Sequence, residues 1–350
     1  MSETVVTQRT NCCSNLNPKK VREDFKEQKL PAWQPSYNSG SIAISFLIIA
    51  IFFLIFGIII TVEEVKVVEV EFDYTDCNNC DQVDFSVNET GCVSCNCSIS
   101  VNIGEDIPKP VYVQYKLDGF YQNHRRYVLS RDDVQLRGDW DKKPSGDCDP
   151  YGTNENGQKI VPCGAIANSI FNDTFELSTS DDVVVNMLRT GIAWASDKDD
   201  KFKNPDGWIE MLQADPSNYA SPPNWCGRTL VTLDVDDESN NGLKNEDLIV
   251  WMRTSSLPTF RKPWRRIDHS QDGFQDGLPK GVYNLTIDYN YPVSRFGARK
   301  SIIITNASEF GTLNEFLGIA YLLVGCVSLL IAGIFLVLRV KGGFGLARPR

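Results

Sequence analysis

Two long stretches without a charged residue decide the fold of this chain: Ile42–Val62 (IAISFLIIAIFFLIFGIIITV) and Phe316–Leu338 (FLGIAYLLVGCVSLLIAGIFLVL). With 21 and 23 residues, each would form a helix of roughly 30 Å, which is the thickness of the hydrocarbon core of a bilayer. We therefore predict two transmembrane helices that separate a tail at residues 1–41, a large domain at 63–315 and a tail at 339–350. The first run starts too far into the chain for a cleaved signal peptide, so we interpret it as a signal-anchor.

N-glycosylation sequons occur only between the two apolar runs, at Asn88, Asn96, Asn172, Asn284 and Asn306. Glycosylation takes place in the secretory pathway, so the sequons indicate that residues 63–315 face the lumen or the cell exterior. Both tails carry more Lys and Arg than Asp and Glu, and the positive-inside rule assigns such tails to the cytosol. The sequence thus predicts a multi-pass membrane protein of the secretory pathway, resident in the endoplasmic reticulum, Golgi, endosome or plasma membrane.

The large domain is acidic. Residues 63–315 hold 41 Asp and Glu but only 25 Lys and Arg, which gives this domain a net charge of −16. A domain of this charge would repel a phosphate backbone, so nucleic acid is excluded as a partner.

Eight of the eleven cysteines fall in the large domain: Cys77, Cys80, Cys92, Cys95, Cys97, Cys148, Cys163 and Cys226. An even number of cysteines in an oxidising compartment favours disulfides. The alternative is a zinc site built from the C-x-x-C at Cys77 and the C-x-C at Cys95, although no histidine lies near them. A bond between Cys148 and Cys163 would close a loop of about 15 residues, for which the chain-entropy estimate is about 3 kcal/mol.

Segments rich in β-branched and aromatic residues predict an antiparallel, sandwich-like β domain. The expected strands are residues 65–74, 111–117, 183–185, 248–252, 282–291 and 301–305. Polar loops rich in Gly, Pro and Asn separate them, notably at 139–157, 197–206 and 268–281. The predicted fold class is an integral membrane protein in which two transmembrane helices bracket a large β-rich, disulfide-stapled, glycosylated ectodomain with long loops.

Sequence motifs give little support for catalysis. The chain has two histidines, His124 and His269, and lacks the common hydrolase, metalloprotease and P-loop motifs. Pairs of adjacent acids do occur, but chance produces them in a domain this acidic. We therefore expect no catalytic residue, no cofactor and no metal ligand set.

One acidic stretch, Asp234–Gly242 (DVDDESNNG), has the alternating oxygens of a calcium loop. Counted from Asp237, however, the twelfth loop position is Leu248 rather than a glutamate, which excludes an EF-hand. An irregular calcium loop and a solvated turn between strands at 229–234 and 248–252 both stay open.

Ordered motifs occur along most of the chain, at 25–35 (FKEQKLPAWQP), 120–138 (FYQNHRRYVLSRDDVQLRG), 162–177 (PCGAIANSIFNDTFEL), 191–205, 245–267 (NEDLIVWMRTSSLPTFRKPWRRI), 288–293 (DYNYPV) and 314–325 (NEFLGIAYLLVG). They resemble the motifs of the cell division control protein fifty family, also called the ligand-effect-modulator family. Its members are accessory β-subunits of type IV P-type ATPases, which move phospholipids to the cytosolic leaflet. The resemblance implies a non-catalytic subunit that forms a heterodimer with such an ATPase, escorts it from the endoplasmic reticulum and supports its transport activity.

The aspartyl-phosphate motif D-K-T-G-T of the catalytic subunit is absent from this chain. A ligand-binding receptor or adhesion ectodomain held by a membrane hairpin is the alternative function. The family pattern also implies nested disulfides, Cys77 with Cys97 and Cys80 with Cys95, together with Cys148–Cys163. Cys92 and Cys226 lie outside that pattern. We expect them to pair with each other, and this expectation rests only on their being the two cysteines that remain.

Small residues recur every seven positions in the second apolar run, at Gly318, Gly325 and Ala332. Such a stripe allows helices to approach closely in lipid. It could bind a helix of the partner, or it could pack against the first apolar run of this same chain.

The first tail interleaves Lys and Arg with apolar residues that include Phe25 and Trp33. This segment could lie on the membrane surface and attract anionic lipids, or it could dock on the ATPase. Simple positive-inside topology would also account for its charge.

We expect the sequons to be occupied unevenly. Asn172 lies within a matched motif and should be modified, whereas Asn306 lies ten residues before the second apolar run and is too near the bilayer. At Asn96, between two cysteines, disulfide formation should compete with glycan transfer.

Overall fold

The computed structural model describes residues 22–23, 25–28, 38–82, 95–214, 216–307, 311 and 315–341. The chain divides into two compact units: Met1–Gly57 with Ala320–Arg350, and Ile58–Ile319. We call them the hairpin and the ectodomain unit.

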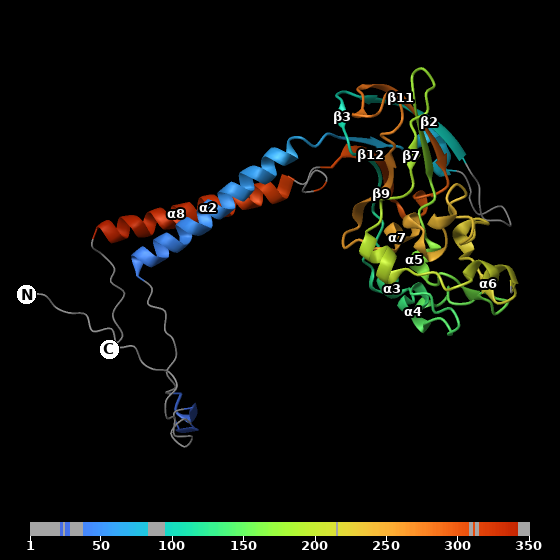
Figure 1. Ribbon diagram of the computed structural model, residues 1–350, viewed down its shortest axis with the longest axis horizontal. Coiled ribbons are helices and arrows are strands. Elements are labelled where there is room, and N and C mark those ends of the chain that lie inside the picture. The colour runs from blue at the N-terminus through green and yellow to red at the C-terminus, as the bar shows by residue number, and fades with distance from the viewer. Residues whose placement is uncertain are drawn as a thin grey trace, which may run out of the picture. The chain divides into compact units, whose positions relative to one another are not determined.

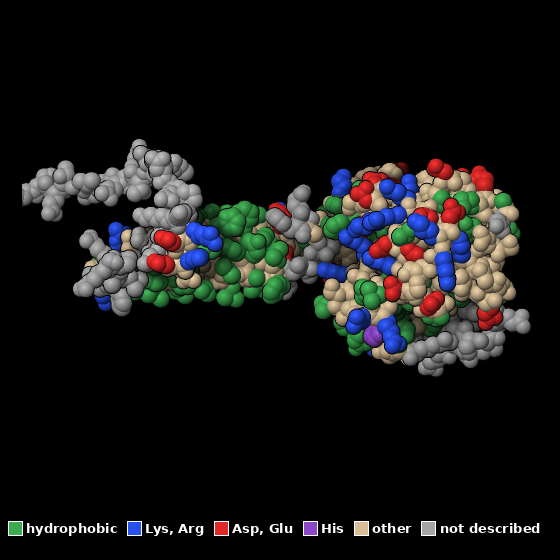
Figure 2. Space-filling model, turned by 90° about the horizontal axis from the view of Figure 1, so that it is seen from below, with side chains coloured by type: hydrophobic (Ala, Val, Ile, Leu, Met, Phe, Trp, Pro, Cys, Tyr) green, Lys and Arg blue, Asp and Glu red, His purple; other side chains and the backbone are tan. Residues whose placement is uncertain are grey.

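Two long apolar helices, α2 (Ser39–Glu64) and α8 (Glu315–Val340), account for the predicted membrane spans. Both are long and apolar enough to cross a membrane. The carboxamide of Asn38 begins α2 by accepting a 2.7 Å hydrogen bond from the backbone N–H of Ser41, which satisfies an amide that has no intrahelical partner. The two helices lie side by side (Figure 1), and their outer surface is mostly hydrophobic (Figure 2).

The larger sheet of the ectodomain unit is antiparallel with the strand order β1-β12-β4-β9-β7. Its strands are β1 (Glu69–Asp73), β12 (Arg299–Asn306), β4 (Val111–Asp118), β9 (Thr259–Ile267) and β7 (Met187–Leu188). All residues of β12 except the first are buried, because β12 lies inside the sheet and is covered on both faces. This explains why 301–305 reads as a continuous apolar run rather than an alternating one.

A second sheet, also antiparallel, has the order β2-β11-β6. Its strands are β2 (Cys95–Ile103), β11 (Gly281–Tyr289) and β6 (Thr174–Thr179). In β11 buried and exposed residues alternate, as expected for a strand with one face on the core. The rings of Phe175 on β6 and Trp264 on β9 meet edge-to-face at 5.0 Å, so the two sheets pack on each other and the predicted sandwich-like β domain is confirmed.

Shorter elements decorate the sheets. Two small strand pairs are β3 (Ile107–Pro108) with β10 (Gly277–Leu278), and β5 (Lys159–Ile160) with β8 (Tyr219–Ala220). The helices are α3 (Arg125–Leu129), α4 (Asp133–Leu136), α5 (Ala165–Asn168), α6 (Trp208–Ala214) and α7 (Glu246–Met252). Figure 1 shows these helices gathered on one side of the domain.

Helical turns of three to six residues complete the ectodomain unit. They are η1 (Cys77–Gln82), η2 (Gly146–Cys148), η3 (Asp197–Lys201), η4 (Pro223–Trp225), η5 (Glu238–Asn240), η6 (Gly242–Lys244) and η7 (Ser294–Phe296). All are 3₁₀ turns except η3, which is a single π-helical turn.

The strand predicted at 248–252 is wrong, because these residues belong to helix α7. The Asn245 side chain caps the helix by accepting from the backbone N–H of Leu248 at 3.0 Å, and Glu246 and Asp247 lie in the first turn. The residues from Leu248 to Met252 are all buried, so the helix shows no apolar periodicity from which its type could be read.

Two other expected strands are also absent from the described residues. Residues 229–234 form turns, and 183–185 contribute only an isolated bridge between Val184 and Ser178. Asp182, with φ of 59°, reverses the chain just before that bridge, so too few residues are left for a second strand of useful length.

Candidate ligand- and partner-binding surfaces

A buried ion pair holds the centre of the ectodomain. The ammonium of Lys300 lies 2.6 Å from the carboxylate of Asp173, and both side chains are 0% exposed. The same carboxylate accepts from the Tyr74 hydroxyl at 2.9 Å and from the backbone N–H groups of Asn290 and Tyr291. It thereby joins the matched motifs at 162–177 and 288–293 to strand β12.

Burial raises the pKa of the Tyr74 hydroxyl well above its ordinary value, and the neighbouring Asp173 raises it further. Tyr74 therefore remains a hydrogen-bond donor at any physiological pH. The Lys300 ammonium also lies over the ring of Tyr289, 3.1 Å from its centroid, a cation–π contact that helps to replace lost hydration. The sequence motifs gave no sign of this centre, because no single residue of it is unusual by type.

Three disulfides staple the described part of the ectodomain: Cys77–Cys97, Cys80–Cys95 and Cys148–Cys163. They are the pairs that the family pattern implied, and they use the four cysteines of the alternative zinc site. Within the described ranges no group of three or more His, Cys, Asp or Glu could hold a metal ion. Cys226 is itself disulfide-bonded, but Cys92 lies outside the described residues, so their pairing stays a prediction.

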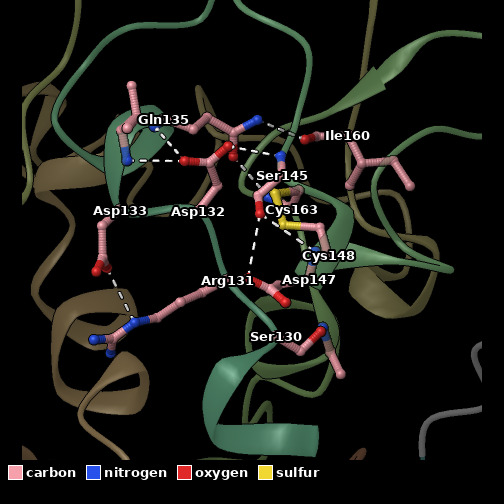
Figure 3. Close-up of a disulfide and its surroundings, with 12 residues drawn as sticks. Ser130, Arg131, Asp132, Asp133, Gln135, Ser145, Asp147, Cys148, Ile160 and Cys163 are labelled. Atoms are coloured by element: carbon pink, nitrogen blue, oxygen red, sulfur yellow. Dashed lines mark hydrogen bonds and ion pairs between the residues drawn. A yellow bond between two sulfur atoms is a disulfide. The ribbon is translucent and has the colours of Figure 1, made fainter.

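The Cys148–Cys163 disulfide is tied to helix α4 by two polar side chains (Figure 3). Asp132 caps α4 through the N–H of Val134 at 2.8 Å and also accepts from the N–H of Ser145 at 2.9 Å. Gln135 donates to the carbonyl of Ile160 at 2.9 Å and accepts from the N–H of Cys163 at 2.8 Å. Short loops on both sides of the disulfide are thus fixed to one helix.

The Asp234–Gly242 stretch forms a turn in which the first carboxylate, that of Asp234, already has partners. The Asp234 carboxylate accepts from the Asn240 amide at 2.7 Å and forms an ion pair with Arg189 at 3.2 Å. Burial alone would raise the pKa of Asp234, but Asn240 and Arg189 outweigh it, so the pKa lies below its ordinary value. With a guanidinium and amides on its oxygens, this carboxylate has no free face for a cation.

The surface of the ectodomain contains a concavity of about 500 Å³, which we call the basic cleft. It is lined by Arg131, Asp133, Leu136, Arg137, Asp197, Lys201, Phe202, Met252, Arg253 and Thr254. The side of the domain that carries α3 and α4 is shown in Figure 2, where Lys and Arg side chains occupy part of the surface with Asp and Glu among them.

Beside the basic cleft lies a smaller, more apolar pocket of about 260 Å³. Trp194 is exposed at its edge, with 65% of its surface accessible, and the guanidinium of Arg253 stacks 4.3 Å from the centre of the Trp194 ring. An exposed tryptophan held by an arginine is typical of residues that dominate binding at interfaces.

The small-residue stripe of α8 packs within the hairpin and beside its end, which agrees with the second of the two alternatives that the sequence left open, and binding of a partner helix stays a prediction. A Cβ atom on Gly325 would lie 2.8 Å from Leu54 of α2, and one on Gly318 would lie 2.6 Å from the hydroxyl of Thr61. Ala332, the third member, is buried. The small residues thus let α8 approach α2 closely. The outer faces of both helices remain available to lipid or to a partner.

The predicted tail contacts are only partly described. Phe25 is exposed, with 69% of its surface accessible, while Trp33 lies outside the described residues. A role of both in binding lipid or the partner stays a prediction.

The sequons differ in accessibility. Asn96 and Asn284 are exposed on β2 and β11, Asn172 is half-buried, and Asn88 lies outside the described residues. Asn306 is only 6% exposed: its amide accepts from the N–H of Val68 at 2.7 Å and donates to the carbonyl of Lys66 at 3.1 Å.

We expect Asn306 to be unmodified, because a glycan on its amide nitrogen would displace the contact with Lys66. Ser308→Ala removes that sequon but keeps the asparagine, and it should leave the electrophoretic mobility unchanged. Asn172→Gln should remove one glycan, as measured by mobility before and after enzymatic deglycosylation. A mobility shift in Ser308→Ala, or none in Asn172→Gln, would contradict this expectation.

A second buried carboxylate makes stability depend on pH. Glu246 accepts from the N–H groups of Ile192 and Ala193 at 2.8 and 3.0 Å and from the Lys198 ammonium at 2.8 Å. Burial would raise the pKa of Glu246, but these donors outweigh it and lower the pKa below its ordinary value of 4.5. The stabilisation is therefore complete above pH 4.5 and is lost as the pH falls through the lower folded-state pKa.

We expect the free energy of unfolding to be insensitive to Glu246 between pH 7 and 5 and to fall below about pH 4.5. Glu246→Gln should lower it by about 1–3 kcal/mol at pH 7 and weaken the loss in acid, since an amide bonds these donors less strongly. Thermal unfolding of the full chain at pH 7, 5 and 3.5 measures both effects. If the wild type and Glu246→Gln lost equal amounts of stability between pH 5 and 3.5, the role of this carboxylate would be disproved.

Comparison with known proteins places the chain in a family. The family model described as LEM3 (ligand-effect modulator 3) family / CDC50 family matches residues 59–343. Cell cycle control protein 50A of Mus musculus is 45% identical over 331 residues, covering 91% of this chain and 88% of the relative. Cell cycle control protein 50B of Homo sapiens is 40% identical, covering 91% and 92%. Putative ALA-interacting subunit 4 of Arabidopsis thaliana is 35% identical, covering 98% and 94%. The chain belongs to the LEM3/CDC50 family, as its sequence motifs suggested.

Proposed function

We propose that this chain is the non-catalytic accessory subunit of a type IV P-type ATPase that moves phospholipids across a membrane. The observation that carries the proposal is the family match, which extends from the last residues of α2 through the whole ectodomain to the end of α8. The LEM3/CDC50 family consists of accessory subunits of these flippases, and the chain is accordingly not an enzyme. One relative is named for interacting with a protein called ALA, which supports a stable heterodimer here as well.

The architecture suits this role. Disulfides and the buried Asp173–Lys300 pair hold the ectodomain in one conformation, and a rigid surface binds without the entropy cost of ordering it. We infer that the ectodomain faces the lumen or cell exterior, that both tails are cytosolic, and that the chain travels through the secretory pathway with its ATPase. It would support the ATPase's exit from the endoplasmic reticulum, its stability and its lipid transport.

Expression of the cognate ATPase with and without this chain tests the proposal. With the chain, affinity purification in mild detergent should yield the ATPase in about equal amounts, and labelled phospholipid should reach the cytosolic leaflet. Without it, the ATPase should remain in the endoplasmic reticulum and transport should be low. Normal export and transport in cells that lack this chain and every related subunit would refute the proposed function.

A further inference from the structure

The basic cleft has a charge opposite to that of the domain around it. Four basic side chains line it, Arg131, Arg137, Lys201 and Arg253, against the two acids Asp133 and Asp197. Its local charge is therefore +2, although residues 63–315 as a whole carry −16. Four like charges around one concavity repel each other, so the arrangement needs either an anion or fixed internal partners.

The buried carboxylate of Asp197 holds two of these cations, Lys201 and Arg253, in place. This carboxylate is 1% exposed and lies 2.7 Å from the Lys201 ammonium and 2.8 Å from the guanidinium of Arg253. The contact with Arg253 is an ion pair rather than a well-aligned hydrogen bond, and the ring of Trp194 stacks on that guanidinium. Both cations keep about half of their side-chain surface exposed, so they remain free to bind a ligand.

The other two cations come from either side of α4. Arg131 is 3.0 Å from Asp133, and the side chains of this pair are 36% and 65% exposed; the pair is visible in Figure 3. Among the described residues, no hydrogen bond or ion pair holds the side chain of Arg137, which is exposed. Because Asp132, Gln135 and the Cys148–Cys163 disulfide fix α4, these two arginines start from a rigid position.

The floor of the cleft is apolar and closed. Leu136, Phe202 and Met252 line it and are each no more than 5% exposed. A volume of about 500 Å³ lies within the range of small-molecule sites and exceeds what one ion needs.

We propose that the basic cleft binds the phosphate group of a small phosphate ester, either a soluble ester or the headgroup of a phospholipid. Arginine guanidinium groups bind phosphate through two parallel hydrogen bonds, and lysine adds a point charge. Arg137 has a free side chain for this purpose, and Arg131, Lys201 and Arg253 surround the same volume. The inference stands apart from the proposed function, since the site needs no ATPase.

Inorganic phosphate is the probe for the test. Equilibrium dialysis of the full chain in neutral detergent should reveal one saturable site, and phosphate should raise the unfolding temperature. Arg137→Gln should weaken binding about tenfold, because a hydrogen bond to a charged group contributes that much. The variant should fold normally, since Arg137 holds no described side chain in place. Arg125→Gln, which removes an exposed arginine of α3 outside the cleft, should bind phosphate like the wild type.

Two further arms identify the source of the phosphate. Displacement of phosphate by glycerophosphoserine would indicate a soluble ester, whereas displacement only by nanodiscs containing phosphatidylserine, and not phosphatidylcholine, would indicate a lipid headgroup. Either result supports the site. It is overturned if no saturable binding occurs up to about 10 mM phosphate, or if Arg137→Gln and Arg131→Gln both bind phosphate as tightly as the wild type. Co-purification of the ATPase with the same variants reports on the proposed function separately.

Discussion

Asp173→Asn is expected to destabilise the ectodomain by about 3–5 kcal/mol, because it leaves the buried Lys300 ammonium without a counter-charge. Lys300 is 0% exposed and cannot regain water without opening the sheet around β12. The Asn172-X-Thr174 sequon remains intact in this variant, so a loss of glycan cannot explain the result. Thermal unfolding of the purified full chain, and its retention in the endoplasmic reticulum, measure the effect.

The matched control breaks an ion pair on the surface of the same domain. Glu71 lies 2.9 Å from the Lys116 ammonium, but their side chains are 37% and 30% exposed, and such pairs contribute about 0–1 kcal/mol. Glu71→Gln should therefore unfold within a few degrees of the wild type. If Asp173→Asn behaved like Glu71→Gln, the buried pair would not stabilise the domain.

A double variant separates charge from packing. Asp173→Leu with Lys300→Met removes both charges, and apolar replacement of a buried pair is often neutral or better. The double variant should regain only part of the lost stability. Asp173 also accepts from the N–H groups of Asn290 and Tyr291, and these donors would be left buried without a partner. The double variant should thus be more stable than Asp173→Asn and less stable than the wild type.

The parts of the fold that are predictable from the sequence are those with an unambiguous pattern. Two uncharged runs longer than 20 residues have few alternatives to a membrane span, and strands such as β11, with one face buried, show period-two alternation. Where burial is complete the pattern disappears, which is why the apolar run of α7 predicts a strand. Only its cap, Asn245 with Glu246 and Asp247, distinguishes it as a helix.

Strand β9 escapes prediction for the opposite reason. Its sequence, TFRKPWRRI, contains four cations and a proline, which are poor signals for an inner strand. Lys262 occurs there because its ammonium donates to the carbonyls of Val250, Trp251 and Arg253 at 2.7–3.2 Å and so caps the end of α7. Near Pro263 the pairing with β4 shifts register, and the β-bulge accommodates a residue without an N–H.

The basic cleft could not be predicted from spacing, because its residues come from three separate segments, 131–137, 197–202 and 252–254. Each cation is ordinary in its own segment. Only the fold brings them together, and only the burial of Asp197 shows that two of them are held in place. The small-residue stripe of α8 correctly indicated close helix packing. The sequence alone does not determine which helix approaches it.

Gly325→Leu is expected to disrupt the hairpin, whereas Gly333→Leu on the same helix is expected to leave it intact. A Cβ at Gly325 would lie 2.8 Å from the side chain of Leu54 and 3.1 Å from its backbone nitrogen, so the backbone of α2 itself would have to move. A Cβ at Gly333 meets nothing within 4 Å among the described residues. Overpacking a close contact costs about 1–3 kcal/mol, and lipid replaces lost helix packing only in part.

The unfolding temperature of the full chain in detergent should therefore fall for Gly325→Leu and stay near that of the wild type for Gly333→Leu. Maturation of the glycans reports whether the ectodomain still folds in each variant. Because Gly325 faces α2, any loss of the ATPase from purified Gly325→Leu should accompany this loss of stability. If Gly333→Leu kept wild-type stability but no longer co-purified with the ATPase, a partner helix would lie on the open face of α8. If Gly325→Leu kept wild-type stability, the packing of α8 on α2 would be refuted.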